Sequence, residues 1–193
     1  MAPPGRHRPA HQRAGSSRVP PREGAGDPDL RRIVPIHLTG QLTREVLSAH
    51  SILMTTITSA HATTAASAAS LFDRWSDIAT WPGWIADVEW ARLDGPFAED
   101  TTGVREPRRG PLTKFVIEQL DTERAYVDVS ILPGARLAFS HVVTASAGGG
   151  CTIDPEITLR GPLRALWERV LGKGLRSTAQ RELDCLVALV ESR

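Results

Sequence analysis

Three side chains in the sequence could carry out acid–base chemistry together: Tyr126, Asp128 and His141. An imidazole titrates near neutral pH, so His141 could move protons in an aldol-type cyclisation or a dehydration. If Pro133-Gly134 centres a hairpin, Tyr126 faces His141 directly and Asp128 lies diagonal to it, so both could hold its tautomer. The alternative is a structural hydrogen-bond cluster of the same three side chains, and the sequence leaves both open.

Several common catalytic and cofactor-binding signatures are missing from the sequence. It has no GxSxG, no GxGxxG after a predicted strand, no HExxH, and no His/Cys group with zinc spacing. The stretch 171–178 lacks the upstream glycine of a phosphate-binding loop, and glycine follows Lys173 where that loop needs Ser or Thr. We therefore expect no metal and no cofactor.

Length and composition set broad limits on the fold and its partners. The chain has 193 residues, 41% of them hydrophobic, and a formal net charge of +1. These values suit one folded core, and we expect no nucleic acid to bind the folded domain. No apolar run approaches the roughly 18 residues of a transmembrane segment. Cys151 and Cys185 lack metal spacing, so we expect reduced thiols in a cytoplasmic protein.

Turn signals divide the chain after residue 53 into an ordered series of elements. The alternating, β-branched stretch 54–64 predicts a strand, Thr64 can cap a helix with one apolar face, and a second short helix ends near Pro82. Six further strand candidates follow: 87–93, 101–106, 112–120, 124–132, 135–144 and 151–160. Consecutive strands with short turns predict an antiparallel meander, and hence an α+β fold of about seven strands.

The last thirty residues predict a long amphipathic helix that begins at Pro162. Its apolar residues form two groups at helical spacing: Leu163, Leu166, Trp167, Val170 and Leu171, then Leu183, Leu186, Val187 and Val190. At 100° per residue the two groups point in different directions, so we expect a bend or a turning contact face near Gly172 and Gly174. Such a helix needs a broad apolar surface, which the sheet would supply.

The hairpin register decides which side chains share a face of this sheet. A hairpin centred on 133–134 and a turn over 121–124 place ten side chains on one face: Phe115, Ile117, Gln119, Tyr126, Asp128, Ser130, Leu137, Phe139, His141 and Val143. The outer strands of this trio favour that face as the interior, whereas Val127, Val129 and Ile131 of the middle strand oppose it. We let the outer strands decide, because β-branched residues also suit exposed sheet faces.

Polar groups on an otherwise apolar interior face predict a small-molecule site, because buried polar groups need a partner or a ligand. The predicted lining is Trp84, Trp90, Phe115, Ile117, Gln119, Tyr126, Asp128, Ser130, Leu137, Phe139, His141, Leu171 and Leu175. Alternatively, Trp81 and Trp84 pin the corner between helix and sheet, and Leu171 and Leu175 are ordinary core residues.

Residues 1–53 differ in composition from the remainder of the chain. As far as residue 32 they are rich in proline and arginine and poor in apolar side chains, which predicts a disordered extension. A basic arm that binds nucleic acid, anionic lipid or another protein is the alternative. Met54 could instead be the true translation start, and the folded domain would in either case span 54–193.

Four stretches carry a resemblance to a known family: 71–84 (LFDRWSDIATWPGW), 93–103, 132–141 (LPGARLAFSH) and 161–163 (GPL). Over about residues 55–191 the chain resembles the SRPBCC, or START-like, superfamily, in particular its polyketide cyclase/dehydrase branch. The resemblance implies a helix-grip fold, in which a curved antiparallel sheet surrounds a long C-terminal helix with a ligand cavity between them. Similar sequences carry an acid and a histidine at the places of Asp128 and His141.

Two functions agree with these observations, because the family includes both carriers and enzymes. The first is a non-catalytic binder or carrier of a small hydrophobic molecule, lipid-like or polyketide-like. The second is a polyketide cyclase or dehydratase that uses His141 as acid/base, with Asp128 and Tyr126 in support. The sequence indicates neither the ligand nor the oligomeric state.

Overall fold

The computed structural model describes residues 54–192, and the predicted extension of residues 1–53 lies outside the described residues. The elements are β1 (Met54–Ser59), β2 (Ala62–Thr64), α2 (Ala68–Ser76), the 3₁₀ helix η2 (Ile78–Gly83), β3 (Val88–Leu93), β4 (Thr102–Pro107), β5 (Thr113–Asp121), β6 (Ala125–Leu132), β7 (Ala135–Ala145), β8 (Cys151–Arg160) and α3 (Arg164–Glu191). The predicted order of a first strand region, two short helices, six strands and a long helix is confirmed.

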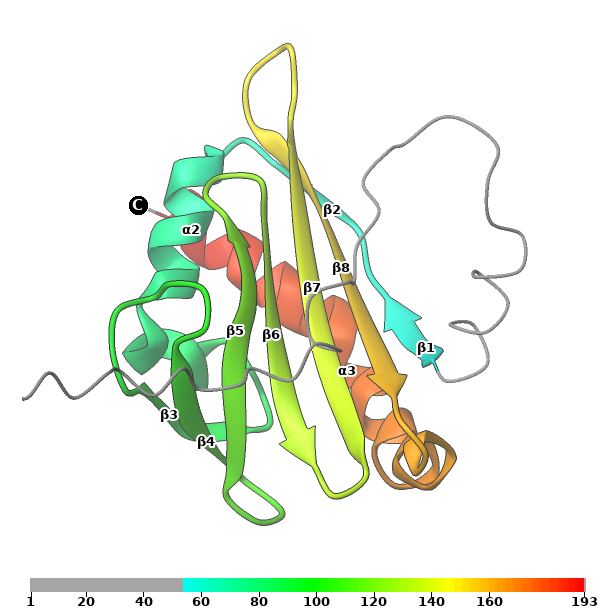
Figure 1. The fold of residues 1–193 in the computed structure, drawn as a ribbon. Coiled ribbons are helices and arrows are strands. Elements are labelled where there is room, and N and C mark those ends of the chain that lie inside the picture. The colour runs from blue at the N-terminus through cyan, green and yellow to red at the C-terminus, as the bar shows by residue number, and fades with distance from the viewer. Residues whose placement is uncertain (1–53, 193) are drawn as a thin grey trace, which may run out of the picture. The chain divides into compact units, whose positions relative to one another are not determined.

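The strands form one antiparallel sheet, in the order β1-β8-β7-β6-β5-β4-β3, with β2 also paired to β8. Strands β3 to β8 are the predicted meander, and the first strand region crosses to the far edge. Figure 1 shows α3 running diagonally behind the strands. This arrangement is the expected α+β helix-grip fold.

The contact face of α3 turns along the helix, as its two apolar groups predict. Its first half packs through Trp167, Leu171 and Leu175 on a small cluster from β1, β7 and β8. Its second half packs through Leu183 and Leu186 on a larger cluster that includes α2 and η2. Both halves belong to one continuous helix. None of the helices within residues 54–192 has the length and apolar character needed to cross a bilayer.

The start of α3 differs from the prediction in two ways. The helix begins at Arg164, not at Pro162. Gly161 adopts a φ of +112°, and a Cβ there would lie 2.9 Å from the carbonyl oxygen of Gly134, to which the Leu163 N–H donates. This tight turn against the β6–β7 hairpin delays the helix. In addition, Leu166 is 54% exposed and part of the predicted apolar stripe therefore has no partner within the described residues.

The N-cap of α2 is Ser67, and the prediction of Thr64 was wrong. Thr64 lies in β2 opposite Cys151, so it is too early in the chain to begin the helix. Its hydroxyl instead donates to Glu191 at 2.7 Å and accepts from the N–H of Ala66. Thr64 thereby ties β2 to the end of α3.

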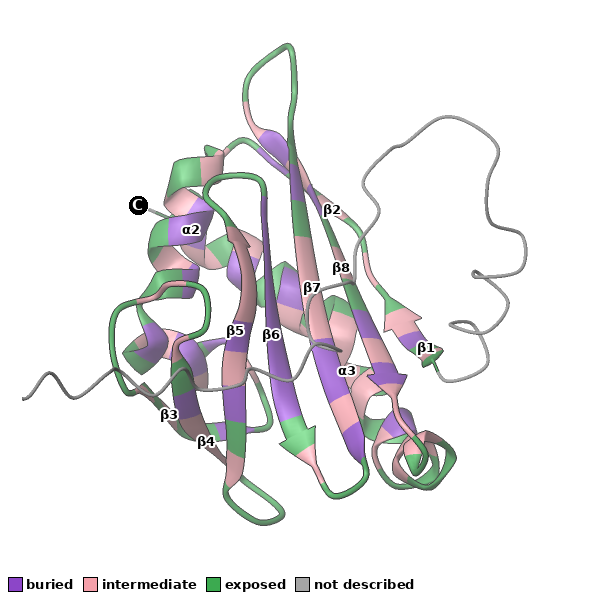
Figure 2. Cartoon of the chain, viewed as in Figure 1, coloured by how far each residue is buried: buried purple, intermediate pink, exposed green. Residues whose placement is uncertain are grey.

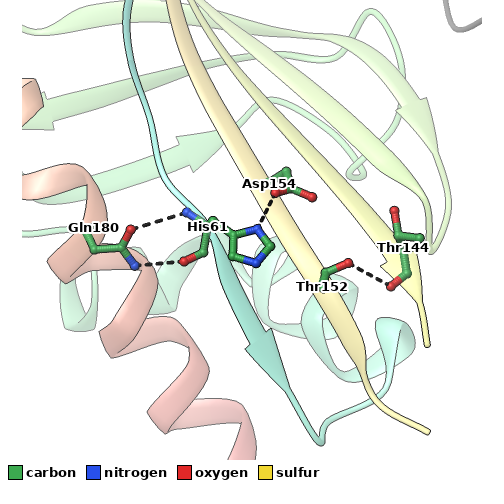
Figure 3. Close-up of polar contacts among 5 residues, drawn as sticks. All are labelled: His61, Thr144, Thr152, Asp154 and Gln180. Carbon is green, nitrogen blue, oxygen red and sulfur yellow. Dashed lines mark hydrogen bonds and ion pairs between the residues drawn. The ribbon is translucent and has the colours of Figure 1, made fainter. Parts of the chain in front are cut away.

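A clamp from α3 holds the chain where β1 stops and β2 starts (Figure 3). The Gln180 side chain accepts from the His61 N–H at 3.3 Å and donates to the His61 carbonyl at 3.1 Å. The His61 ring lies 2.7 Å from Asp154 on β8. His61 therefore has a partner, which its sequence neighbours did not reveal.

The outer face of the sheet, away from α3, contains a third apolar cluster. Val127 and Val129 pack there with Ala138 and are buried, although they were predicted to lie on an exposed face. Figure 2 shows most of β6 in the colour of buried residues. An ion pair joins Glu118 on β5 to Arg160 on β8. Because β6 and β7 lie between these two strands, the paired side chains must extend across them and help to cover the cluster.

Candidate functional site

A cavity of about 610 Å³ lies between the sheet and α3. Most of its wall is apolar, with a few polar groups among the aromatic and aliphatic side chains. Nine of the residues predicted to form the site line it: Trp84, Tyr126, Asp128, Ser130, Leu137, Phe139, His141, Leu171 and Leu175. The predicted β6–β7 register, with Tyr126 opposite His141, is confirmed and explains why these side chains converge.

Four other predicted residues do not line the cavity. Phe115 and Ile117 lie on the predicted face but are fully buried in the core behind the wall. A bulge in β5 between Ile117 and Gln119 places Gln119 opposite Val127, on the outer face. Trp90 is 40% exposed on β3. These four side chains therefore lie outside the cavity wall.

The two tryptophans of the Trp-Pro-Gly-Trp stretch have different environments. Trp81 is buried, and its Nε1 donates to the Trp75 carbonyl at 3.0 Å, so it pins the corner between α2 and the sheet. Trp84 packs at 6.4 Å from it in a T-shaped arrangement and lines the cavity. Trp81 also lines the cavity, so it both pins the corner and forms part of the wall.

Arg105 is the main polar group of the cavity, and our sequence reasoning missed it. It projects from β4 and forms an ion pair with Asp128, in which the two side chains are 11% and 3% exposed. Aromatic rings surround the guanidinium, with the Phe115 centroid at 4.5 Å and the Phe139 centroid at 5.2 Å. Aromatic faces stabilise a cation, so the site is built to hold a buried positive charge.

His141 and Tyr126 form a separate stacked pair. Their ring centroids lie 4.3 Å apart with an interplanar angle of 2°, and Tyr126 Oη is 3.5 Å from His141 Nε2. Trp75 packs against both rings. Asp128 is paired with Arg105, so the predicted support of His141 by Asp128 is replaced by an Asp–Arg pair beside a His–Tyr pair.

Burial and the charge of Arg105 set the protonation states in the cavity. Burial, followed by the nearby Arg105 guanidinium, lowers the pKa of His141 to about 3. Burial, followed by the Asp128 carboxylate, raises the pKa of Tyr126 well above its usual value. Burial raises the pKa of Asp128, and Arg105 opposes that shift. The expectation that His141 titrates near neutrality is corrected, because at pH 7 its imidazole is neutral.

We expect the variant His141→Gln to lose less stability on acidification than the wild type. A histidine in the unfolded chain titrates near pH 6.5, whereas the pKa of His141 in the folded protein is about 3. Between these values the unfolded state binds the extra proton, so the free energy of unfolding falls as the pH drops below about 6.5. Urea denaturation at steps between about pH 7 and 4 measures the difference in slope.

The difference between the two proteins isolates His141. Asp87, Asp128 and Glu182, whose pKa values are raised, favour the folded state on acidification, and they are present in both proteins. His61→Gln changes an exposed histidine and serves as the matched control. Parallel curves for the wild type and His141→Gln would contradict the buried, neutral state of His141.

Three buried polar atoms of cavity-lining residues have no hydrogen-bond partner among the residues that the structure describes. They are Trp84 Nε1, Arg105 Nε and His141 Nδ1. Trp84 Nε1 and Arg105 Nε always carry a hydrogen, and a buried N–H without a partner typically costs about 1–3 kcal/mol. A ligand with an acceptor oxygen could therefore gain hydrogen bonds here. Within residues 54–192, no three His, Cys, Asp or Glu side chains lie together as in a metal site.

A family model described as polyketide cyclase / dehydrase and lipid transport matches residues 54–191. None of the curated proteins matches the chain in sequence.

Solved structures share the fold at low sequence identity. The di-domain ARO/CYC StfQ from the steffimycin biosynthetic pathway has a TM-score of 0.61 at 15% identity, over 77% of this chain and 54% of its own, so the chain spans about half of that protein. Norcoclaurine synthase from Thalictrum flavum has a TM-score of 0.55 at 15% identity, over 83% of this chain and 100% of its own. Ara h 8.0201 has a TM-score of 0.55 at 16% identity, over 72% and 99%.

Proposed function

The chain belongs to the polyketide cyclase/dehydrase and lipid transport family, and on that premise we propose that it binds a small hydrophobic molecule in the cavity between the sheet and α3. The cavity volume of about 610 Å³ carries this proposal. Sites for small molecules span roughly 300–1,000 Å³ and are mostly apolar with a few placed polar groups. Burial of apolar ligand surface in such a wall supplies the affinity.

The polar end of the cavity suits a ligand that also carries an oxygen acceptor. The unpaired N–H groups of Arg105 and Trp84 can donate hydrogen bonds to a carbonyl, phenol or carboxylate oxygen, whereas a hydrocarbon would leave them unpaired. Asp128 keeps Arg105 neutralised as a pair, so the ligand need not carry a full negative charge. The proposed ligand is therefore amphipathic, with a lipid-like or polyketide-like body.

A cyclase or dehydratase is the second candidate, and the contact between His141 and Tyr126 in the cavity wall favours it. A neutral imidazole beside the Tyr126 hydroxyl could accept a proton from a bound polyketide-like substrate. The pKa of about 3 makes His141 a weak base, which is why binding without turnover is the leading proposal. The likeness to ARO/CYC StfQ concerns the fold and does not decide between them.

We expect native mass spectrometry of the protein purified from its own host to show a co-purifying hydrophobic molecule. The added mass should disappear after extraction with organic solvent, and a fluorescent hydrophobic dye should then bind the emptied protein. A protein with no added mass and no dye binding would contradict the proposed function. Incubation with an aromatic polyketide precursor separates the candidates: a carrier retains it unchanged, and an enzyme converts it in a manner that His141→Ala reduces.

A further inference from the structure

Five exposed apolar side chains gather at one end of the cavity. They are Leu112 in the β4–β5 loop, Ile131 at the end of β6, and Leu163, Leu166 and Val170 at the start of α3, between 44% and 61% exposed. We call them the apolar rim. Leu112, Ile131 and Val170 also line the cavity. Figure 1 shows the β4–β5 loop, the β6–β7 hairpin and the start of α3 at the same end of the sheet.

Hydrogen bonds hold the rim in place. The Leu163 N–H donates to Gly134 in the β6–β7 hairpin at 2.9 Å, and Trp167 Nε1 donates to the Pro133 carbonyl at 2.9 Å. The start of α3 is thereby fixed to the hairpin beside Ile131. The rim is a preformed surface, and clustered exposed apolar side chains mark an interaction site more often than scattered ones do.

The charge around the rim is strongly positive, in contrast to the remainder of the domain. The segments 107–114, 131–136 and 161–173 carry seven Lys/Arg and one Glu. The other described residues carry seven Lys/Arg and 17 Asp/Glu. The rim end therefore has a formal charge of +6 and the rest a charge of −10. Glu168 is paired with Arg176 at 2.7 Å. Two acids outside these segments offset part of the positive charge: Glu89 pairs with Arg108 at 2.7 Å, and Asp87 lies near Arg108 and Arg109.

An uneven distribution of charge orients a protein before it touches a charged surface. An anionic surface attracts the cations of these segments, so the cavity entrance turns toward that surface on arrival. The cations nearest the exposed α3 side chains are Arg164, Arg169 and Lys173. Cations beside apolar side chains are the combination that binds the interface of a bilayer.

We propose that the apolar rim docks on the surface of a membrane that contains anionic lipids. A bilayer presents negative headgroups directly above an apolar layer, and this matches cations that surround exposed leucine, isoleucine and valine side chains. An acidic protein would match the charges but not the opening of an apolar cavity within the rim. The proposal deepens the proposed function, on which it rests for one point: a docked cavity could exchange its ligand with the bilayer without exposing it to water.

Vesicle sedimentation with the full chain tests this proposal. We expect binding to phosphatidylcholine vesicles that contain about one third phosphatidylserine, no binding to phosphatidylcholine alone, and weaker binding at high salt. Leu166 is half-exposed and does not line the cavity, so Leu166→Glu should reduce binding about tenfold or more. Charge reversal of Arg169 and Lys173 should cost at least about fivefold for each cation.

Matched controls change the same chemistry away from the rim. Val142→Glu alters a 37% exposed side chain on β7, and Arg181→Glu alters an exposed cation on the second half of α3. Both should bind the anionic vesicles like the wild type. The proposal is overturned if the wild type does not bind, if the controls lose as much as the rim variants, or if the rim retains an acidic protein and no vesicle.

Dye binding in solution separates this proposal from the proposed function. Leu166→Glu should keep wild-type affinity for the hydrophobic dye while losing vesicle binding, which supports docking by the rim. Vesicle binding that depends on the rim, in a protein that binds no dye, would support docking and count against the cavity ligand alone. Equal loss of dye and vesicle binding in Leu166→Glu would show misfolding or a shared site, and would overturn the assignment of docking to the rim.

Discussion

Replacement of Arg105 by methionine is expected to lower the free energy of unfolding by about 3–5 kcal/mol at neutral pH. Arg105 and Asp128 are paired and almost fully buried, so the change leaves a carboxylate without its counter-ion in an apolar wall. Methionine keeps an unbranched side chain of similar reach, so the loss reports mainly on charge and less on a new cavity. Chemical denaturation of both proteins measures it.

The same variant should regain stability on acidification. Burial already raises the pKa of Asp128, and removal of Arg105 raises it further because the attraction to the guanidinium is lost. A folded-state pKa above the unfolded value means that the folded protein binds the proton first, so this group stabilises at low pH and the benefit is lost as the pH rises through the folded pKa. A deficit that stays constant between about pH 7 and 4 would contradict this explanation.

Two further variants complete the test. Addition of Asp128→Asn to Arg105→Met removes the unpaired charge and should restore most of the lost stability at neutral pH. Arg108→Met breaks an exposed pair with Glu89, at 2.7 Å, and is the matched control. Its cost should fall within about 0–1 kcal/mol, because solvent screens such pairs. Equal losses of unfolding free energy in Arg105→Met and Arg108→Met would show that the buried pair contributes no more to stability than an exposed pair.

The order of elements was predictable because turns rich in Gly, Pro and Asp separate strands in which apolar and polar residues alternate. The β6–β7 hairpin is the best case, since Pro133-Gly134 fixes its register and all pairs from Leu132 to Tyr126 follow. The neighbouring hairpin shows the limit of this reasoning. Its bulge near Glu118 shifts Gln119 to the outer face and brings Leu120 opposite Tyr126. Alternation alone cannot locate a bulge, because one extra residue leaves no compositional signal.

Arg105 escaped prediction because a charged side chain in a strand is most often exposed. The structure explains its position: Gly103 lies opposite Phe115 in the β4–β5 pairing, so Arg105 shares the interior face with Phe115. The buried Asp128 also required a cation. Neither inference is possible without the β4–β5 register, which the loop of residues 108–112 does not specify. The site therefore depends on long-range pairing that local patterns do not contain.

The start of α3 also differs from what its sequence pattern predicts. Its apolar spacing predicted a buried stripe, yet Leu166 and Val170 are exposed and only Trp167 and Leu171 pack on the sheet side. Helical periodicity identifies an apolar face but not the surface that covers it. The hydrophobic pattern of this segment is consistent with a partner outside the folded domain, as in the proposed docking on a membrane.

Replacement of Ala179 by tryptophan should abolish ligand binding without unfolding the protein. Ala179 lies on α3, is half-buried and lines the cavity, so a large ring there fills the space that the ligand needs. We expect a loss of affinity for the hydrophobic dye of at least about 100-fold, which corresponds to roughly 3 kcal/mol. Filled cavities commonly stabilise a fold, so the free energy of unfolding should stay equal or rise.

Ala188→Trp is the matched control, because Ala188 lies on the exposed side of the same helix. It should leave dye affinity unchanged. Leu175→Trp, at another position in the cavity wall, should also block binding. It provides an independent test in case overpacking by Ala179→Trp destabilises the fold. Retained affinity in both wall variants, together with native stability, would mean that the dye binds elsewhere. The cavity between the sheet and α3 could then not be the binding site, because filling it would leave ligand binding unchanged.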